Sequence, residues 1–390
     1  MRLRDVRKVK VQGKRVLVRV DYNVETSAAG RPRDVTRLQA TIPTITWLLK
    51  HGAVVILVSH RGRPAGRAAK FSLRPLLPTL RRLIGRPVQF ISEPVYSHAV
   101  TAAVEALRPG QVALLENIRF EAGEEDDSPR LAKRLASFAD LMVNDAFADS
   151  HRAHASIVGV AREIPAYAGL LLQREHDELS TLLKRPARPY VAILGGAKIS
   201  TKLHLISQLL KRADMVLLGG ALANTILQAE GTAIGTSFSE PSLLKQAAGL
   251  SVTNAKLKIP CDVITATKRV RQAPHQVRPV GRIGRREMIL DIGPDTLDLY
   301  GRVIAKARTV VWNGPMGVYE VTPFDRGTTA LARLIGRHRC RSIAGGGETL
   351  DAIHRARADR QFTFLSTGGG AMLEFLEGKH LPGLSAVAYH

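Results

Sequence analysis

The sequence predicts an α/β protein with two doubly wound, Rossmann-like parallel-sheet domains, joined by a connecting helix and a hinge. Its 390 residues exceed one ordinary domain of about 100–200 residues. Short, almost wholly apolar segments alternate with helical ones, which is typical of parallel strands covered on both faces. Most apolar segments end in glycine or polar residues, and ligands bind at the strand ends of such sheets.

The first half contains five strand-like segments. Residues 14–20 run into Asp21, Tyr22 and Asn23, and residues 53–58 run into the cationic stretch 59–64. The other segments follow the same pattern, with strands at 88–91, 112–115 and 141–143 and helices near 36–51 and 76–85. We therefore expect polar side chains from several loops to gather at one edge of a sheet.

A helical segment at 168–183 separates the halves, and the proline-containing stretch 184–189 ends it. We interpret these residues as a connecting helix and a linker. The strands expected after them lie near 191–194, 215–218, 263–266, 309–312, 341–344 and 362–365.

Three glycine-rich turns of the second half favour an anion as ligand. Glycine lets backbone N–H groups approach a ligand, and the dipole of a following helix adds partial positive charge. A tight turn without a ligand would explain one such loop but hardly three. The turns are Gly195-Gly196 with Lys198 and Lys202 after it, the triplet 345–347 before Glu348 and Thr349, and the triplet Gly368, Gly369 and Gly370.

Composition limits the class of protein. Hydrophobic residues make up 45% and charged residues 23%, as in a globular protein, and the net charge is +23. Such a charge attracts polyanions, so nucleic-acid binding stays open, although zinc spacing, an RNP-type aromatic motif and a basic heptad helix are absent. A cleft for phosphorylated substrates explains only a handful of these charges.

The location that we expect is the cytoplasm, with no membrane partner. No run of about 20 apolar residues is present, and the N-terminus lacks the apolar core of a signal peptide. Cys261 and Cys340 lie far apart and form no CxxC motif, which favours free thiols in a reducing compartment.

The two halves differ in chemistry. The first half offers cationic side chains, which grip carboxylate or phosphate groups. The second half offers glycine loops, lysines and acidic residues. Two anionic ligands on two domains suggest phosphoryl transfer across a cleft. The cationic candidates are Arg37, His60, Arg63, Arg119, Arg152 and His154.

Motifs along nearly the whole chain resemble those of the phosphoglycerate kinase family. Each is moderately specific, and their occurrence in this order is very specific. They are residues 19–24 (RVDYNV), 59–64 (SHRGRP), 114–120 (LLENIRF), 144–147 (NDAF), 151–156 (HRAHAS), 194–202 (LGGAKISTK), 291–294 (DIGP), 312–320 (WNGPMGVYE) and the two glycine triplets.

The resemblance implies reversible phosphoryl transfer between 1,3-bisphosphoglycerate and MgADP, giving 3-phosphoglycerate and MgATP. It implies a 3-phosphoglycerate-binding domain at 1–167 with the tail 376–390, a connecting helix at 168–185 and a nucleotide-binding domain at 186–375. We also expect a monomer, with Mg²⁺ carried as the nucleotide complex.

The resemblance also assigns the site residues. Substrate contacts fall on Asp21, Tyr22, Asn23, Arg37, His60, Arg61, Gly62, Arg63, Arg119 and Arg152. Nucleotide contacts fall on Lys198, Lys202, Asn313, Glu320, Gly346, Gly347, Glu348 and Thr349, with Glu348 as metal ligand. Charge neutralisation of the transferring group falls on Arg37, Lys202, Gly368, Gly369 and Gly370. A carboxylate nucleophile is already ionised at neutral pH, so no general base is expected.

Four positions depart from the usual family pattern. Glu25 replaces a common Pro, Arg61 a common Leu, and Ala148 a frequent Gly. Glu348 stands where Asp is usual; it keeps the hard carboxylate that Mg²⁺ prefers but adds a methylene group. We expect retained activity with an altered metal preference.

Structural roles compete with these assignments. A strand-end histidine often bonds to backbone, an aspartate caps a helix, and arginines, lysines or a loop acid lie on a solvated face. A metal site around His151, His154, Asp145 and Asp149 is disfavoured by irregular ligand spacing. A different ATP-using α/β enzyme, an inactive relative and a polyanion-binding protein stay open as functions.

Overall fold

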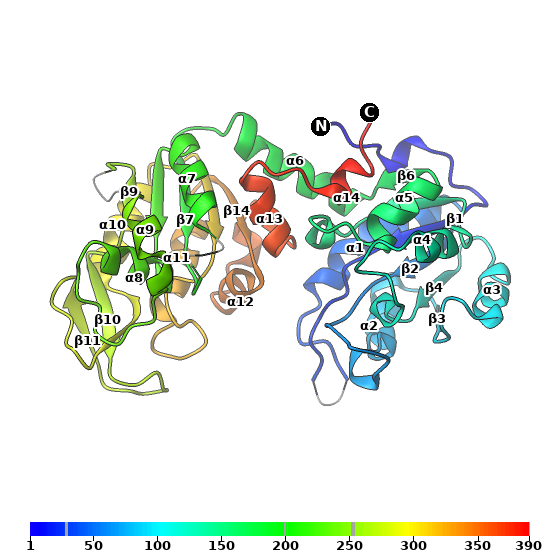
Figure 1. Ribbon diagram of the computed structural model, residues 1–390. Coiled ribbons are helices and arrows are strands. Elements are labelled where there is room, and N and C mark those ends of the chain that lie inside the picture. The colour runs from blue at the N-terminus through cyan, green and yellow to red at the C-terminus, as the bar shows by residue number, and fades with distance from the viewer. Residues whose placement is uncertain (28–29, 199, 201, 251–253, 390) are drawn as a thin grey trace. The chain divides into compact units, whose positions relative to one another are not determined.

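The computed structural model describes residues 1–27, 30–198, 200, 202–250 and 254–389, which form two compact units (Figure 1). Unit 1 comprises Met1–Glu178 and Lys379–His390, and unit 2 comprises Leu179–Gly378. Helix α6 (Leu170–Lys184) begins in the first range and ends in the second. The 194–202 motif includes Ile199 and Thr201, which lie outside the described residues.

Unit 1 is built on a six-stranded sheet in the order β3-β4-β2-β1-β5-β6, and all its strand pairs are parallel. Strands β1 and β2 supply the apolar centre, because every residue of β2 is buried. Because the strands are parallel, their carboxyl ends lie along one edge of the sheet. The bounds are β1 (Arg15–Arg19), β2 (Val54–Val58), β3 (Val88–Ile91), β4 (Val112–Leu115), β5 (Leu141–Asn144) and β6 (Ala166–Ala168).

Amphipathic helices cover this sheet. Leu38, Ile45 and Leu48 of α1 pack into its core, α2 ends at Gly85 with a left-handed φ of 71°, and the Ser97 side chain caps α3. The helices are α1 (Thr36–Lys50), α2 (Leu77–Ile84), α3 (His98–Glu105), α4 (Pro129–Ala136), α5 (Val160–Glu163) and α14 (Pro382–Ser385).

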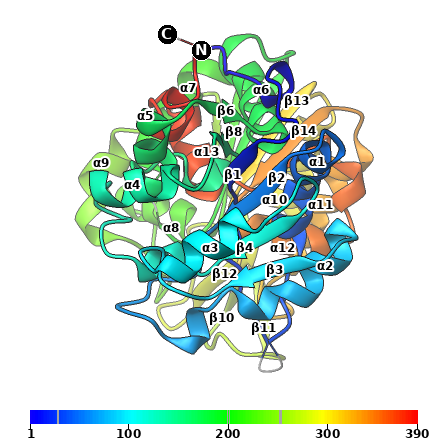
Figure 2. The same cartoon turned by 90° about the vertical axis from the view of Figure 1, so that its right-hand side faces the viewer.

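The C-terminal segment joins unit 1, and Figures 1 and 2 show the two chain ends close together. The Arg4 N–H donates to the Val387 carbonyl, and the Tyr389 N–H donates to the Arg2 carbonyl. Asn144 at the end of β5 donates to the Gly383 carbonyl at 3.1 Å. The tail is thus held beside the strand ends of unit 1.

Unit 2 has its own six-stranded parallel sheet, in the order β15-β14-β13-β7-β8-β9. Trp312, Tyr300 and Ile335 are fully buried in its core. The two parallel sheets confirm the predicted α/β class. The strands are β7 (Tyr190–Leu194), β8 (Met215–Leu218), β9 (Leu257–Lys258), β13 (Thr309–Asn313), β14 (Arg341–Gly345) and β15 (Phe364–Ser366).

The strand predicted near 263–266 is present, but the prediction that it belongs to the parallel series was wrong. This strand, β10 (Asp262–Ala266), lies in a separate antiparallel sheet between β11 (His275–Pro279) and β12 (Met288–Ile292). The exposed residues of β11 lack an apolar pattern, which explains why the sequence did not reveal it. The helices of unit 2 are α7 (Leu203–Arg212), α8 (Gly220–Ala229), α9 (Leu244–Ala248), α10 (Pro294–Ile304), α11 (Arg326–Arg337), α12 (Gly347–Arg355) and α13 (Gly369–Leu376).

Several boundaries also differ. Strand β6 precedes the connecting helix, which begins at Leu170 rather than at residue 168. Helices α12 and α13 begin inside the glycine triplets, at Gly347 and Gly369, so part of each triplet forms a helix N-terminus. Among the described residues, no helix is long and apolar enough to cross a membrane.

Candidate active site

The loop after β1 and the first turn of α1 hold an acid and an arginine together in unit 1. Arg37 Nη1 of α1 donates to Asp21 Oδ2 at 2.6 Å. The other oxygen of Asp21 accepts the Asn23 N–H at 3.0 Å, so the carboxylate also shapes its own loop. Asn23 Oδ1 accepts the Gly62 N–H at 2.9 Å and thereby connects the loops after β1 and β2.

Arg119, after β4, is a buried cation with donors to spare. Its Nη1 donates to the Gly62 carbonyl at 2.7 Å. Nε and Nη2 are buried without a hydrogen-bond partner among the described residues, although Nη2 lies 3.3 Å from an oxygen of the exposed Glu125. Burial lowers the pKa of Arg119, and the Glu125 charge opposes that change. These donors would be satisfied by an anionic ligand.

Two other cations of this region differ in exposure. Arg63 is exposed and has no ion-pair or hydrogen-bond partner within the described part of the chain. Arg152 is half-buried, and its Nε donates to His151 Nε2 at 3.1 Å. Gly62, between Arg61 and Arg63, has φ of 66°, and a Cβ there would meet the Phe71 ring at 2.4 Å, so the turn requires glycine.

Two predicted substrate contacts have buried side chains that are bonded within the protein. Tyr22 is fully buried in the core, and its hydroxyl lies 3.1 Å from Thr41 Oγ1. Arg61 is buried and donates to the Val24 carbonyl, the Ser72 carbonyl and Thr26 Oγ1 at 3.1, 2.8 and 2.6 Å. Their polar groups are already bonded within the protein, so we expect them to support the loops, and their assignment to ligand contact stays a prediction.

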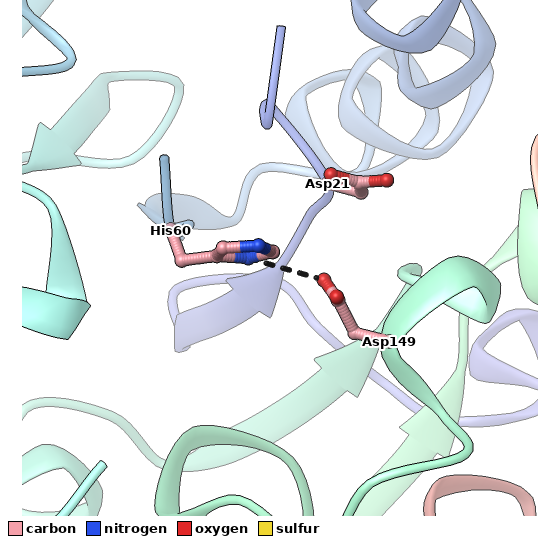
Figure 3. A group of neighbouring side chains, drawn as sticks. All are labelled: Asp21, His60 and Asp149. Carbon is pink, nitrogen blue, oxygen red and sulfur yellow. Dashed lines mark ion pairs between the residues drawn. The ribbon is translucent and has the colours of Figure 1, made fainter. Parts of the chain in front are cut away.

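A buried cluster that sequence reasoning missed lies under these loops. Arg19, at the end of β1, is fully buried, and its Nη2 lies 3.1 Å from Asp149 Oδ2 and 3.2 Å from His60 Nδ1. Figure 3 shows His60 and Asp149 pointing toward each other, with Asp21 nearby. A charged residue ending an otherwise apolar strand was the available signal for Arg19.

This cluster is poorly suited to a metal ion. Ligand atoms of Asp21, His60 and Asp149 lie within 4.8 Å of one another. However, Arg19 and Arg37 already neutralise the two carboxylates. Burial by itself raises the pKa of Asp149, but contact with His60 and the charges of Arg19 and Arg119 hold it well below its usual range. The surrounding guanidinium groups repel cations and attract anions.

In unit 2, the loops after β7 and β13 approach closely. The Gly195 N–H donates to the Asn313 carbonyl at 2.9 Å. Gly314 has φ of 93°, and a Cβ there would lie 2.3 Å from the Gly195 carbonyl oxygen, so only glycine fits. Lys202 Nζ donates to the same oxygen at 2.6 Å. Burial lowers the pKa of Lys202 to about 8, although the Glu348 charge raises it.

The loop after β14 is tied to the loop after β13. Asn313 Nδ2 donates to the Gly345 carbonyl at 2.7 Å, and Thr349 Oγ1 accepts the Gly314 N–H at 2.7 Å. Glu348, in the first turn of α12, is exposed and has no ion-pair partner among the described residues. One free carboxylate in the first turn of a helix, where phosphate groups commonly bind, is a donor set that suits Mg²⁺, which usually keeps several waters.

The C-terminal triplet forms a helix N-terminus. The Gly368 N–H donates to Ser366 Oγ at 3.1 Å, whereas the N–H groups of Gly369 and Gly370 donate to no described residue. A Cβ at Gly369 or Gly370 would meet nothing within 4 Å. The first turn of α13 is thus open to an anion.

A cavity of about 480 Å³ lies next to the glycine loops of unit 2. Its apolar lining suits a flat heterocycle. Glu320 lines it and is ion-paired with Arg269, while Lys198 is exposed and does not line it. Sequence reasoning did not locate the apolar lining, which includes Phe238, Met288, Leu290, Met316 and Val318.

Comparison with known proteins matches this arrangement to one family. The model of the family described as phosphoglycerate kinase matches residues 6–379. The phosphoglycerate kinase of Rhodospirillum centenum is 46% identical over 386 residues, covering 97% of both chains. That of Moorella thermoacetica is 46% identical over 384 residues, again covering 97% of both chains. The chain belongs to the phosphoglycerate kinase family.

Solved phosphoglycerate kinase structures share the fold. The enzyme of Coxiella burnetii has a TM-score of 0.86 at 38% identity, covering 99% of this chain and 98% of that chain. The enzyme of Pyrococcus horikoshii OT3 has a TM-score of 0.88 at 29% identity with the same coverage. Family membership confirms the resemblance drawn from the motifs and identifies the chain as a phosphotransferase.

Proposed function

We propose that this kinase transfers a phosphoryl group reversibly between 1,3-bisphosphoglycerate and MgADP, giving 3-phosphoglycerate and MgATP. The family match over nearly the whole chain carries this proposal. Each unit supplies one half of the chemistry, with free guanidinium donors in unit 1 and open glycine loops in unit 2. The cytoplasm as its location and a monomeric state belong to the same proposal.

The anionic 3-phosphoglycerate binds in unit 1. The unsatisfied donors of Arg119, the exposed Arg63 and the half-buried Arg152 bind its charged groups. Asp21, Asn23 and the main chain of Gly62 shape the pocket, and the Asp21–Arg37 pair presents a further guanidinium. His60 supplies a ring nitrogen, while Tyr22 and Arg61 support the loops from behind.

The nucleotide binds in unit 2. Its base occupies the cavity of about 480 Å³, and Glu320 at the cavity is placed for the ribose hydroxyls. Its phosphates lie against Lys198 and the turn at Gly346, Gly347 and Thr349, with Asn313 holding that turn. Glu348 would hold Mg²⁺, which supplies charge neutralisation to the phosphates when bound.

Transfer needs positioning and charge neutralisation rather than a general base, because the nucleophilic carboxylate is ionised at neutral pH. Lys202, Arg37 and the N–H groups of Gly368, Gly369 and Gly370 stabilise the transferring group. Since the two ligands bind different units, we include a closing movement about the connecting helix, which also excludes water.

A coupled assay of 3-phosphoglycerate-dependent ATP consumption tests the proposal. We expect ADP formation only when 3-phosphoglycerate, ATP and Mg²⁺ are all present. ATP hydrolysis that does not depend on 3-phosphoglycerate would indicate another ATP-using enzyme, and no ATP consumption would indicate an inactive relative. Glycerate without its phosphate is a matched control substrate, and we expect it to give no turnover.

A further inference from the structure

The Nδ1 atom of His60 lies between two competing neighbours. Arg19 Nη2 is 3.2 Å away. Asp149 Oδ2 is 3.3 Å away, and a dashed line marks this contact in Figure 3. A protonated Nδ1 would donate to the carboxylate, whereas an unprotonated Nδ1 would accept from the guanidinium. The two contacts therefore imply different protonation states of the ring, and only one of them can be made.

The orientation of Arg19 decides between them. Its Nε donates to Ser156 Oγ at 2.9 Å, and its Nη1 donates to the Val20 carbonyl. Ser156 in turn donates to the buried Glu124 Oε1 at 2.6 Å. Because the guanidinium group is planar, these bonds fix the direction of the Nη2 hydrogens.

The hydrogen bonds of the cluster agree with that orientation. Arg19 Nη2 meets His60 Nδ1 in hydrogen-bonding geometry, whereas the buried Asp149 Oδ2 has no hydrogen-bond partner among the described residues. Asp149 contacts Arg19 at 3.1 Å as a counter-ion. The 3.3 Å contact between Asp149 Oδ2 and His60 Nδ1 thus lacks hydrogen-bond geometry.

We propose that Arg19 is a positioning residue that keeps Nδ1 of His60 unprotonated, so that the ring is the neutral Nε2–H tautomer. A guanidinium group has no lone pair, so it must be the donor and Nδ1 the acceptor. Nε2 donates to no described residue and remains available to a ligand. Resting on the proposed function, that ligand is an anionic oxygen of 3-phosphoglycerate, which accepts the Nε2–H.

Asp149 has a different role from that of a carboxylate that orients a catalytic histidine. A proton shared between Nδ1 and Asp149 in the neutral ring would leave a lone pair on Nε2, which repels an anionic oxygen. Asp149 instead neutralises Arg19, which is fully buried, and so allows a guanidinium to remain beneath the substrate loops.

Nitrogen NMR of the full-length chain, labelled with ¹⁵N-histidine at pH 7.5, tests this assignment. We expect the His60 Nδ1 resonance at the position of an unprotonated nitrogen and the Nε2 resonance at that of an N–H. The His60→Gln variant identifies these resonances by their loss. A proton on Nδ1, whether in the other tautomer or in an imidazolium, would overturn the proposal on the wild-type spectrum alone.

Two variants separate the roles of Arg19 and Asp149, the two neighbours of His60 Nδ1. Arg19→Met leaves Asp149 as the only partner, so the proton should move to Nδ1, and KM for 3-phosphoglycerate should rise about tenfold with kcat changed less than twofold. Asp149→Ala should leave the tautomer unchanged. Arg302→Met is the matched control, because Arg302 lies on α10 in an exposed ion pair with Asp298. It should change neither the tautomer of His60 nor KM for 3-phosphoglycerate. A tautomer that changes in Asp149→Ala but not in Arg19→Met would contradict the proposal.

A ligand titration separates this inference from the proposed function. Addition of 3-phosphoglycerate should shift Nε2 and its proton, while Nδ1 keeps its unprotonated position. If calorimetry detected no binding of 3-phosphoglycerate to the wild type, the proposed function would fail, and the tautomer would still be decided by the spectrum of the free protein.

Discussion

Lys202 Nζ donates a hydrogen bond of 2.6 Å to the carbonyl oxygen of Gly195, and the lysine side chain is buried. This bond holds the ammonium group against the loop after β7 rather than in solvent. The nearby carboxylate of Glu348 supports the charged form, whereas burial opposes it. A buried cation held in place is suited to neutralise charge that develops during transfer.

We expect Lys202→Ala to lower kcat by on the order of 10²–10³, because it removes one preorganised donor from the transition state. The KM for MgATP should change only modestly, since the glycine loops still bind the phosphates. Steady-state kinetics checks this result, with Lys211→Ala at an exposed position of α7 as the control. Wild-type turnover in Lys202→Ala would remove Lys202 from the mechanism.

The lowered pKa of Lys202 predicts a basic limb in the pH profile. Burial brings this pKa to about 8, so the cation loses its proton as the pH rises through that value. The value of kcat/KM for MgATP reports groups of the free enzyme and should fall about fivefold from pH 8 to pH 9 and about tenfold per pH unit above that. In Lys202→Arg, whose charge persists, this limb should be absent. A flat wild-type profile up to pH 9.5 would contradict the assignment.

Methionine substitutions at Arg61 and at Arg63, two residues apart, should affect different properties. The first should lower stability, and the second should raise KM for 3-phosphoglycerate. Arg61→Met leaves one buried and two half-buried acceptors without their donor and should reduce the free energy of unfolding by about 1–3 kcal/mol. Arg63→Met, at an exposed site, should change it by less than about 0.5 kcal/mol but raise KM for 3-phosphoglycerate at least about tenfold. Urea unfolding and kinetics of both variants test this contrast, and equal destabilisation would refute it.

At the metal position, Glu348→Asp should retain turnover and change metal dependence. The exposed glutamate lies in the first turn of α12 and reaches one methylene further than aspartate, so its carboxylate would hold a hard cation at a different distance from the helix. The ratio of activities with Mg²⁺ and Mn²⁺ is the measurement, and Asp351→Glu, one turn further along α12, is the control. An unchanged ratio together with unchanged turnover would end the idea of an altered preference.

The parallel sheets were predictable because β2 and β7 are buried on both faces and therefore read as unbroken apolar runs. Strand β11 was not predictable in this way. Its exposed residues carry no alternation, and it is held by antiparallel pairing with β10, a contact between distant parts of the chain. Pairing of this kind depends on tertiary structure rather than on local pattern.

At the site, motifs located the loops but not the direction of each side chain. Arg61 and Arg63 flank one glycine, yet Arg61 is buried by partners at Val24, Thr26 and Ser72, which only the fold brings close. Arg19 was hidden for the same reason, because its partners His60, Asp149 and Ser156 come from separate segments. The sequence thus predicts which loops meet, and packing decides which side chains face a ligand.

The last prediction concerns Asp145, which follows β5. Its Oδ1 accepts the N–H groups of Leu171 and Leu172 at the start of α6, whereas Oδ2 is buried without a partner among the described residues. Burial raises the pKa of Asp145 to about 7, although hydrogen bonds from Thr44, Leu172 and Leu171 lower it. In the unfolded chain this pKa is about 3.9.

Between these two values the folded protein binds more protons than the unfolded chain, so stability falls as the pH rises. The Asp145 contribution is complete below about pH 4 and is lost as the pH rises through about 7, at up to about 1.4 kcal/mol per pH unit. Asp145→Asn, which resembles the protonated acid, should lose this slope. Urea unfolding at pH 5 and pH 7.5 measures it, with the exposed Asp126→Asn as control. Parallel pH dependence of wild type and Asp145→Asn would show that the carboxyl stays ionised throughout.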